Sequence, residues 1–260
     1  MPANSLVDNI PLWILLIATV AIVLLSVEGG YRLGVYRHRR SDQEKETPVG
    51  EMVAATLGLL AFLLAFTFGF AASRYQDRQL VVLEEANAIG TAWLRAGLLP
   101  DLEKVASRKL LCEYVATRVD GVESGQLEST ISRSEEIQLE LWQYAENAAR
   151  IQDSMVKTGL YIQSLNDVID RHADRVMLGI EHRIPLVIWL VLFGETILAM
   201  SAMGYHGGLT GSTRSLASLA IAFAFSGVII LIADLDNPAS GLIRTGQQPL
   251  VDVQRMMGDG

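Results

Sequence analysis

Three phenylalanines recur at every fourth position of one apolar stretch: Phe62, Phe66 and Phe70. Because an α-helix turns once in 3.6 residues, this spacing places the three rings on one side of a helix. A stack of such rings, repeated around a symmetric oligomer, would form a hydrophobic constriction that gates ion passage by dewetting. The ordinary alternative is a set of rings that face lipid or pack against neighbouring helices. The spacing alone leaves both interpretations open.

Charged residues follow directly after this aromatic stripe. Arg74 and Arg78 lie one helical turn apart, and snorkelling to the membrane interface or local salt bridges would explain both. Glu84 and Glu85 interrupt an apolar helical pattern and could line a vestibule, where their charge would enrich cations. We therefore take these four residues as candidate pore or vestibule charges.

A single acidic residue, Glu195, lies in the middle of another apolar stretch. An acidic side chain at the centre of a bilayer costs roughly 2–3 kcal/mol, so we expect it to face protein or water. One hypothesis is a role in ion passage or proton binding. The other is an interhelical hydrogen bond, with Gly194 and Thr196 allowing another helix to approach closely.

A cluster of oxygen-bearing side chains ends the last apolar stretch, in the segment "DLDNPASG" (234–241). Asp234, Asp236 and Asn237 could together bind a cation such as calcium, although the segment is too short for an EF-hand loop. The alternative is a polar helix stop, because Pro238 cannot continue a helix.

The motifs of known enzyme classes are missing from the sequence. It has no nucleophile triad, phosphate-binding loop, dinucleotide fingerprint or paired zinc ligands. With one cysteine, Cys112, no internal disulfide can form. We expect neither enzymatic activity nor a cofactor. The four histidines are scattered along the chain without ligand spacing: His38, His172, His182 and His206.

The elements that must position these residues are long apolar helices. Half of the 260 residues are apolar and only 19% are charged, which is unusual for a soluble domain of this size. Each of four blocks has about the 20 residues that a helix needs to cross the hydrocarbon core. The first block lacks the basic start and the cleavage site of a signal peptide. The blocks are Ile10 to Val27, Met52 to Ser73, Ile184 to Tyr205, and Ser215 to Ala233.

Between the second and third blocks lies a long polar region with helical rather than strand periodicity. Its acidic residues outnumber its basic ones, which argues against binding to nucleic acid. Apolar residues at helical spacing, such as Val82, Ala86 and Ile89, predict faces that pack together as a bundle. The turn signals are "LLPD" (98–101) and "DGVESGQ" (120–126), with Asp101 and Ser132 as candidate N-terminal caps.

The predicted fold is an all-α membrane protein with four transmembrane helices. We expect the second and third spans to continue without a break into the extramembrane helical bundle. The predicted parts are a first transmembrane helix with a basic linker (1–50), a second transmembrane helix with a long extramembrane extension (51–98), an extramembrane helical domain (99–183), transmembrane helices 3 and 4 (184–233), and an acidic exit with a C-terminal tail (234–260).

Three segments resemble the bestrophin superfamily, and more closely its bacterial four-span members of unknown function. They are "FGFAASRYQDRQLVVLEEA" (68–86), "DLDNPASG" (234–241) and "QQPLVD" (247–252), within a resemblance that covers roughly residues 50–252. Bestrophins are pentameric channels whose second span lines a pore narrowed by stacked apolar residues. The resemblance implies that role for Phe62, Phe66 and Phe70, with Phe66 the best placed.

The same resemblance implies a homo-oligomer, by analogy a pentamer, in the lipid bilayer of a bacterial inner membrane. It implies transport of small monovalent ions, with anions favoured. The chain lacks the longer acidic run that forms the calcium clasp of animal bestrophins. A non-conducting membrane scaffold or sensor with a helical extramembrane module is the alternative function.

The side of the membrane that holds the bundle is left open by the charges. The basic linker after the first span, which includes Arg32, Arg37 and Arg40, would lie in the cytoplasm by the positive-inside rule. The bundle would then lie outside, whereas the bestrophin resemblance requires the reverse. The linker charges are nearly balanced by arginines that flank the membrane on the opposite side: Arg74, Arg78, Arg171, Arg175 and Arg183.

Overall fold

The computed structural model describes residues 11–40, 46–124, 126–151, 155–178, 184–211, 216–237 and 241–258. Within these ranges the chain forms eight helices and no strand, so the all-α prediction is confirmed. The helices fall into two compact units. Unit 1 comprises Met1–Tyr75 and Arg183–Arg244, and unit 2 comprises Gln76–His182 and Thr245–Gly260.

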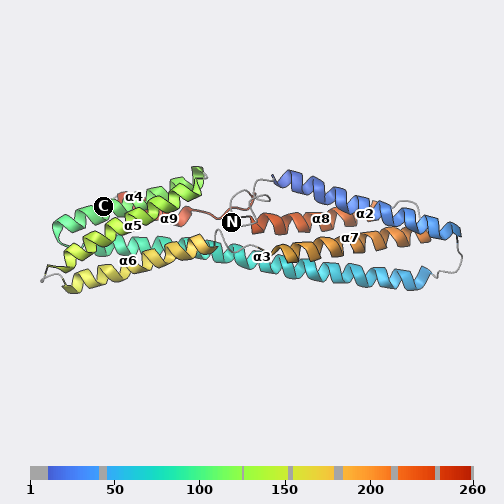
Figure 1. Cartoon of the computed structure of the whole chain (residues 1–260), viewed down its shortest axis with the longest axis horizontal. Helices are drawn as coiled ribbons and strands as arrows, with labels where there is room; N and C mark the ends of the chain where they lie inside the picture. Colours follow the sequence, from blue (N-terminus) through green and yellow to red (C-terminus); the bar gives the residue numbers. More distant parts are fainter. Residues whose placement is uncertain are drawn as a thin grey trace. The chain divides into compact units, whose positions relative to one another are not determined.

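Unit 1 holds the apolar helices (Figure 1). Each of its four helices has a stretch that is long and apolar enough to cross a membrane, which confirms the four predicted spans. The second of them in the chain, α3, belongs to both units: its uncharged part ends at Ser73, and its residues from Gln76 on belong to unit 2. The helices are α2 (Leu12–Arg40), α3 (Glu46–Ala96), α7 (Leu186–Leu209) and α8 (Leu216–Asp236).

The first helix is longer than predicted. The sequence suggested a span that ends at Val27 and a linker after it, but α2 continues as a helix to Arg40. The linker prediction was therefore wrong for residues 28–40. Gly30 and Gly34 of this segment are buried, and the packing that buries them can offset the low helix propensity of glycine.

These glycines allow α2 and α7 to approach backbone to backbone. A Cβ atom at Gly30 would overlap the carbonyl of Ser201 on α7, and one at Gly204 of α7 would overlap the carbonyl of Val27 on α2. Gly34 and Gly208 make the same kind of contact one turn further along. Small residues spaced four apart on both helices are a common device for close helix packing in membranes.

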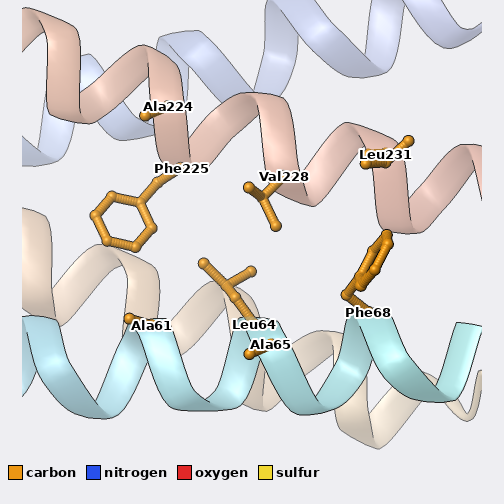
Figure 2. Close-up of a pocket in the computed structure, with 8 residues that line it drawn as sticks. All are labelled: Ala61, Leu64, Ala65, Phe68, Ala224, Phe225, Val228 and Leu231. Atoms are coloured by element: carbon orange, nitrogen blue, oxygen red, sulfur yellow. The ribbon is translucent and has the colours of Figure 1, made fainter.

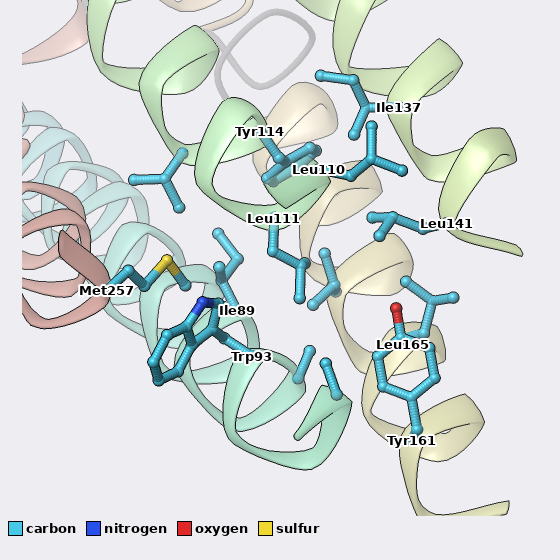
Figure 3. Close-up of a cluster of buried hydrophobic side chains, with 14 of the residues drawn as sticks. Ile89, Trp93, Leu110, Leu111, Tyr114, Ile137, Leu141, Tyr161, Leu165 and Met257 are labelled. Atoms are coloured by element: carbon cyan, nitrogen blue, oxygen red, sulfur yellow. The ribbon is translucent and has the colours of Figure 1, made fainter. Parts of the chain in front are cut away.

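Unit 2 is a helical bundle with its own apolar core. The part of α3 from Gln76 packs there with α4 (Asp101–Ser124), α5 (Leu127–Ala149), α6 (Met155–Val176) and α9 (Gln248–Gly258). Figure 3 shows side chains from these helices meeting in the core, with Trp93 and Met257 on one side and Tyr161 and Leu165 on the other. The predicted apolar face of α3, Val82, Ala86 and Ile89, is buried in this core.

Two of the predicted boundaries in unit 2 need correction. Helix α4 begins at Asp101, so this residue lies in its first turn and is not the predicted cap, and the helix continues to Ser124, through most of the predicted 120–126 turn. Helix α5 then begins at Leu127, so Ser132 lies inside it and is not its cap. The residue at the N-cap position is Gln126, which makes no side-chain capping bond.

The third span does not continue as one helix from the bundle. Helix α6 ends at Val176, and α7 begins at Leu186 with Pro185 at its N-cap position. Proline has no backbone N–H and clashes with the preceding turn, so it favours a helix start and disrupts a helix interior. The predicted uninterrupted extension is therefore correct for the second span and wrong for the third. Residues 179–183 lie outside the described ranges.

The close contact between α2 and α7 predicts opposite effects of the same change at two adjacent glycines. Gly29 has open space around its Cβ position, so Gly29→Ala should stabilise the helix by roughly 0.5–1 kcal/mol. Gly30→Ala should destabilise unit 1 by about 1–3 kcal/mol, because the methyl group overlaps the backbone of α7. Thermal unfolding of the detergent-purified variants, followed by size-exclusion chromatography, measures both. Equal stability of the two variants would contradict this packing.

Candidate functional site

The aromatic stripe lies on the uncovered side of α3. Phe62 is 66% exposed, Phe66 70% and Phe70 39%. The other side of the same helix is buried in unit 1 through Leu60 and Leu64. The described helices of the protomer therefore leave the stripe largely uncovered, which argues against packing within one protomer as the role of these rings.

A positively charged side chain, Arg74, lies against the last ring of the stripe, Phe70. The guanidinium carbon of Arg74 lies 4.2 Å from the centre of the Phe70 ring, in cation–π geometry. The Nη1 atom of Arg74 is buried and has no hydrogen-bond partner in the described part of the chain. The aromatic face thus holds this arginine beside the end of the stripe.

A groove lined by apolar side chains lies on another side of α3, against α8. It has a volume of about 410 Å³, and Figure 2 shows Phe68 pointing from α3 toward α8 at one end of it. Without a polar side chain in its lining, the groove offers little to orient a polar substrate. The residues that line it are Ala61, Leu64, Ala65, Phe68, Ala224, Phe225, Val228 and Leu231.

Glu195 is half-buried on α7. Its Oε1 atom is buried and has no hydrogen-bond partner among the described residues. The expected interhelical hydrogen bond is thus missing for this oxygen within the described protomer. The neighbouring Gly194 has open space at its Cβ position, and Thr196 donates to the carbonyl of Leu192 on its own helix.

The acidic exit of α8 binds backbone amides. Both carboxylate oxygens of the buried Asp234 are used: Leu242 N–H donates to Oδ1 at 2.8 Å, and Ile243 N–H donates to Oδ2 at 3.1 Å. Asp236 accepts the N–H of Ile184 at 3.0 Å. These bonds hold the chain where it leaves α8 and where it approaches α7.

The candidate cation site loses support from this geometry. The backbone N–H of Asn237 donates to the carbonyl of Asp234 in the last turn of the helix. In the described ranges no three His, Cys, Asp or Glu side chains converge as metal ligands. The arrangement favours the interpretation as a polar helix stop, although Pro238 itself lies outside the described residues.

Glu85 lies at the centre of a buried charge cluster in unit 2. Its side chain is fully buried, and its Oε1 atom lies 3.0 Å from Nε of Arg118. Its Oε2 atom accepts a hydrogen bond from Nη1 of Arg175. Two guanidinium groups thus flank one carboxylate inside the bundle. The sequence-based vestibule role does not fit Glu85, because within this protomer its charge does not reach the surface.

Tyr114 connects this carboxylate to a histidine. Its hydroxyl lies 3.1 Å from Oε1 of Glu85 and 3.1 Å from Nδ1 of His172, and Gln138 donates to it at 3.3 Å. The one phenolic hydrogen goes to the charged carboxylate, since charge-assisted hydrogen bonds are the stronger ones. His172 then donates from Nδ1 to the tyrosine oxygen, which fixes its neutral tautomer.

Burial and charge together set the ionisation of this cluster. Burial alone raises the pKa of the Glu85 carboxyl, but Arg175 and Arg118 lower it further than burial raises it, so it is held below its ordinary value. Burial and, to a smaller extent, the charge of Arg118 lower the pKa of His172 to about 4. Burial and then Glu85 raise the pKa of the Tyr114 hydroxyl. Near neutral pH the cluster therefore contains an ionised carboxylate and a neutral histidine.

The other predicted charges have different surroundings. Arg78 is buried in unit 2, whereas Glu84 is half-buried and lies 2.9 Å from Nη1 of Arg171. Sequence reasoning grouped Glu84 with Glu85, but adjacent positions on a helix point about 100° apart. The partners of Glu85 were missed because Tyr114, Arg118 and Arg175 are distant in sequence.

Residues 12–250 of the chain match the family model of the bestrophin-like domain. The chain belongs to the bestrophin-like family. With four apolar spans, this bestrophin-like protein is a multi-pass integral membrane protein. Among curated proteins, no sequence matches it.

Two crystal structures of variants of a bacterial bestrophin homolog from Klebsiella pneumoniae are similar to the bestrophin-like chain. One has a TM-score of 0.70 at 13% identity and covers 94% of this chain and 96% of the other. The second has a TM-score of 0.69 at 14% identity and covers 95% of this chain and 98% of the other. At such low identity the likeness establishes the fold, and it extends over nearly the whole chain.

The two adjacent glutamates predict a matched pair of stability effects. Glu85→Gln removes the buried carboxylate that Arg118 and Arg175 share and should cost about 3–5 kcal/mol. Glu84→Gln removes a partly exposed ion pair with Arg171 and should cost about 0–1 kcal/mol. Chemical unfolding followed by circular dichroism measures the difference. If Glu84→Gln proved as costly as Glu85→Gln, the buried cluster would not stabilise the bundle.

Proposed function

We propose that this bestrophin-like protein is a homo-oligomeric ion channel whose pore is lined by α3. The observation that carries the proposal is the uncovered stripe of Phe62, Phe66 and Phe70 on a helix whose opposite side is buried. Repeated around a symmetry axis, the stripe would form an apolar neck that water leaves when the pore closes. Membership of the bestrophin-like family supports this role for the second span.

Anions are the favoured ions. Arg74 sets a positive charge 4.2 Å from the Phe70 ring, at one end of the proposed neck. Glu84 and Glu85, which would have favoured cations, have little negative charge left to attract them. Glu85 is buried between two arginines, and Glu84 is paired with Arg171. These charges agree with the anion preference that family analogy suggests.

The assembly that such a neck requires is a ring of identical subunits. By family analogy we propose a pentamer in a bacterial inner membrane, passing small monovalent ions. Closed rings are the usual outcome when a helix face is repeated by a rotation axis. The uncovered side of α3 supplies such a face.

Ion flux from liposomes tests the proposal. Phe66→Ala should change the flux or its selectivity under chloride, sodium and potassium gradients, because it widens the neck at its most exposed ring. Phe68→Ala is the matched control, since this ring lies in the groove against α8 and should leave flux near that of the parent. Absence of flux from a properly assembled parent oligomer would instead favour a non-conducting scaffold or sensor.

A further inference from the structure

The buried cluster of unit 2 has an excess of positive charge. It contains one carboxylate, Glu85, and two guanidinium groups, Arg118 and Arg175, beside a neutral His172. Glu85 is fully buried, and His172 and Arg118 are 4% and 5% exposed. Water can do little to screen a further charge at such a place.

His172 has one atom that can accept a proton. With its Nδ1 bonded to the Tyr114 hydroxyl, its Nε2 atom is buried and has no hydrogen-bond partner within the described ranges. A proton at Nε2 would turn the ring into an imidazolium. The side chain thus has a defined site for protonation, in surroundings that disfavour the added charge.

The groups that face His172 offer only one compensating charge. Helix α3 contributes Glu85, α4 contributes Tyr114 and Arg118, and α6 itself contributes Arg175. Helix α5 contributes a neutral amide, Gln138, through its bond to Tyr114. Glu85 is already shared by the two arginines and the tyrosine. An imidazolium would therefore compete with the arginines for a carboxylate that is fully used.

Arg175 connects this cluster to the C-terminal helix. While its Nη1 bonds Glu85, its Nη2 donates to Oε1 of Gln247 at 2.6 Å. Gln247 directly precedes α9, and its carbonyl accepts the N–H of Leu250 in the first helical turn. Helix α9 is docked by two buried side chains, Leu250 and Met257. Gln247 thus joins the charge cluster to the start of a short helix with a small buried face.

We propose that protonation of His172 weakens the bond between Glu85 and Arg175, frees Gln247, and so undocks α9 from the bundle in acid. The inference goes beyond ion conduction and does not depend on it, because it concerns a conformational change within unit 2. It assigns the cluster a regulatory role in addition to its contribution to stability.

The direction of the pH effect follows from the protonation states. Burial and, to a smaller extent, Arg118 lower the pKa of His172 to about 4 while the cluster is intact, below its ordinary value of 6.5. Opening the Glu85–Arg175 bond leaves Glu85 free to pair with the imidazolium, so the undocked state has the higher His172 pKa and binds more protons. Docking therefore weakens as the pH falls from about 6.5 toward 4. The lowered pKa of Glu85 acts in the same direction, below its ordinary value of 4.5.

Hydrogen exchange of the full-length protein in lipid tests the proposal. Amide protection of α9 is measured near pH 7.5 and near pH 5, with correction for the intrinsic pH dependence of exchange and with α8 as internal reference. In the parent we expect protection of α9 to fall in acid, by at most about tenfold per pH unit, while that of α8 stays constant. In His172→Gln, which has no titrating ring, protection of α9 should be the same at both pH values.

Two further variants separate the cluster from other effects of acid. His206→Gln removes a histidine of unit 1 and should keep the acid response. Gln247→Ala removes the acceptor of Arg175 without removing a titrating group, so α9 should already be less protected at neutral pH. Constant protection of α9 in the parent, or an acid response that persists in His172→Gln, overturns the proposal. If His172→Gln does not fold, full protection of α9 in Gln247→Ala at neutral pH overturns it.

Discussion

A helix at the edge of a bundle buries only one side against the other helices, and this is true of α3 in both units. In unit 1 its buried side includes Leu60 and Leu64, and in unit 2 it includes Val82 and Ile89. In unit 1 the phenylalanine stripe is left on the uncovered side, where it is open to lipid or to another subunit. A membrane protein that leaves three phenylalanine rings uncovered at spacing i, i+4 and i+8 has a face suited to symmetric assembly.

The helices of the two units are held together by different kinds of contact. In unit 1, backbones approach through glycines such as Gly30 and Gly204, since apolar contact alone gives little preference for protein over lipid. In unit 2, apolar packing surrounds a charge cluster in which Glu85 must remain paired, because an uncompensated buried charge is very costly. The requirement for pairing makes the bundle sensitive to any proton added beside Glu85.

The sequence was informative where one segment alone decides the structure. Hydropathy located the four spans, and helical spacing identified the buried face of α3 and the phenylalanine stripe. It failed where distant segments decide together. The helix from Val27 to Arg40 depends on glycine contacts with α7, and the burial of Glu85 depends on arginines more than 30 residues away in the chain. The break before the third span could have been inferred locally from Pro185.

The most direct measurement is an electron cryomicroscopy structure of the protein assembled in a lipid nanodisc. The account predicts a closed ring of subunits in which Phe62, Phe66 and Phe70 of every α3 point toward the central axis. Arg74 should lie beside the last ring of this neck. A ring or smaller assembly in which these phenylalanines face lipid, with another helix lining the axis, would contradict the account.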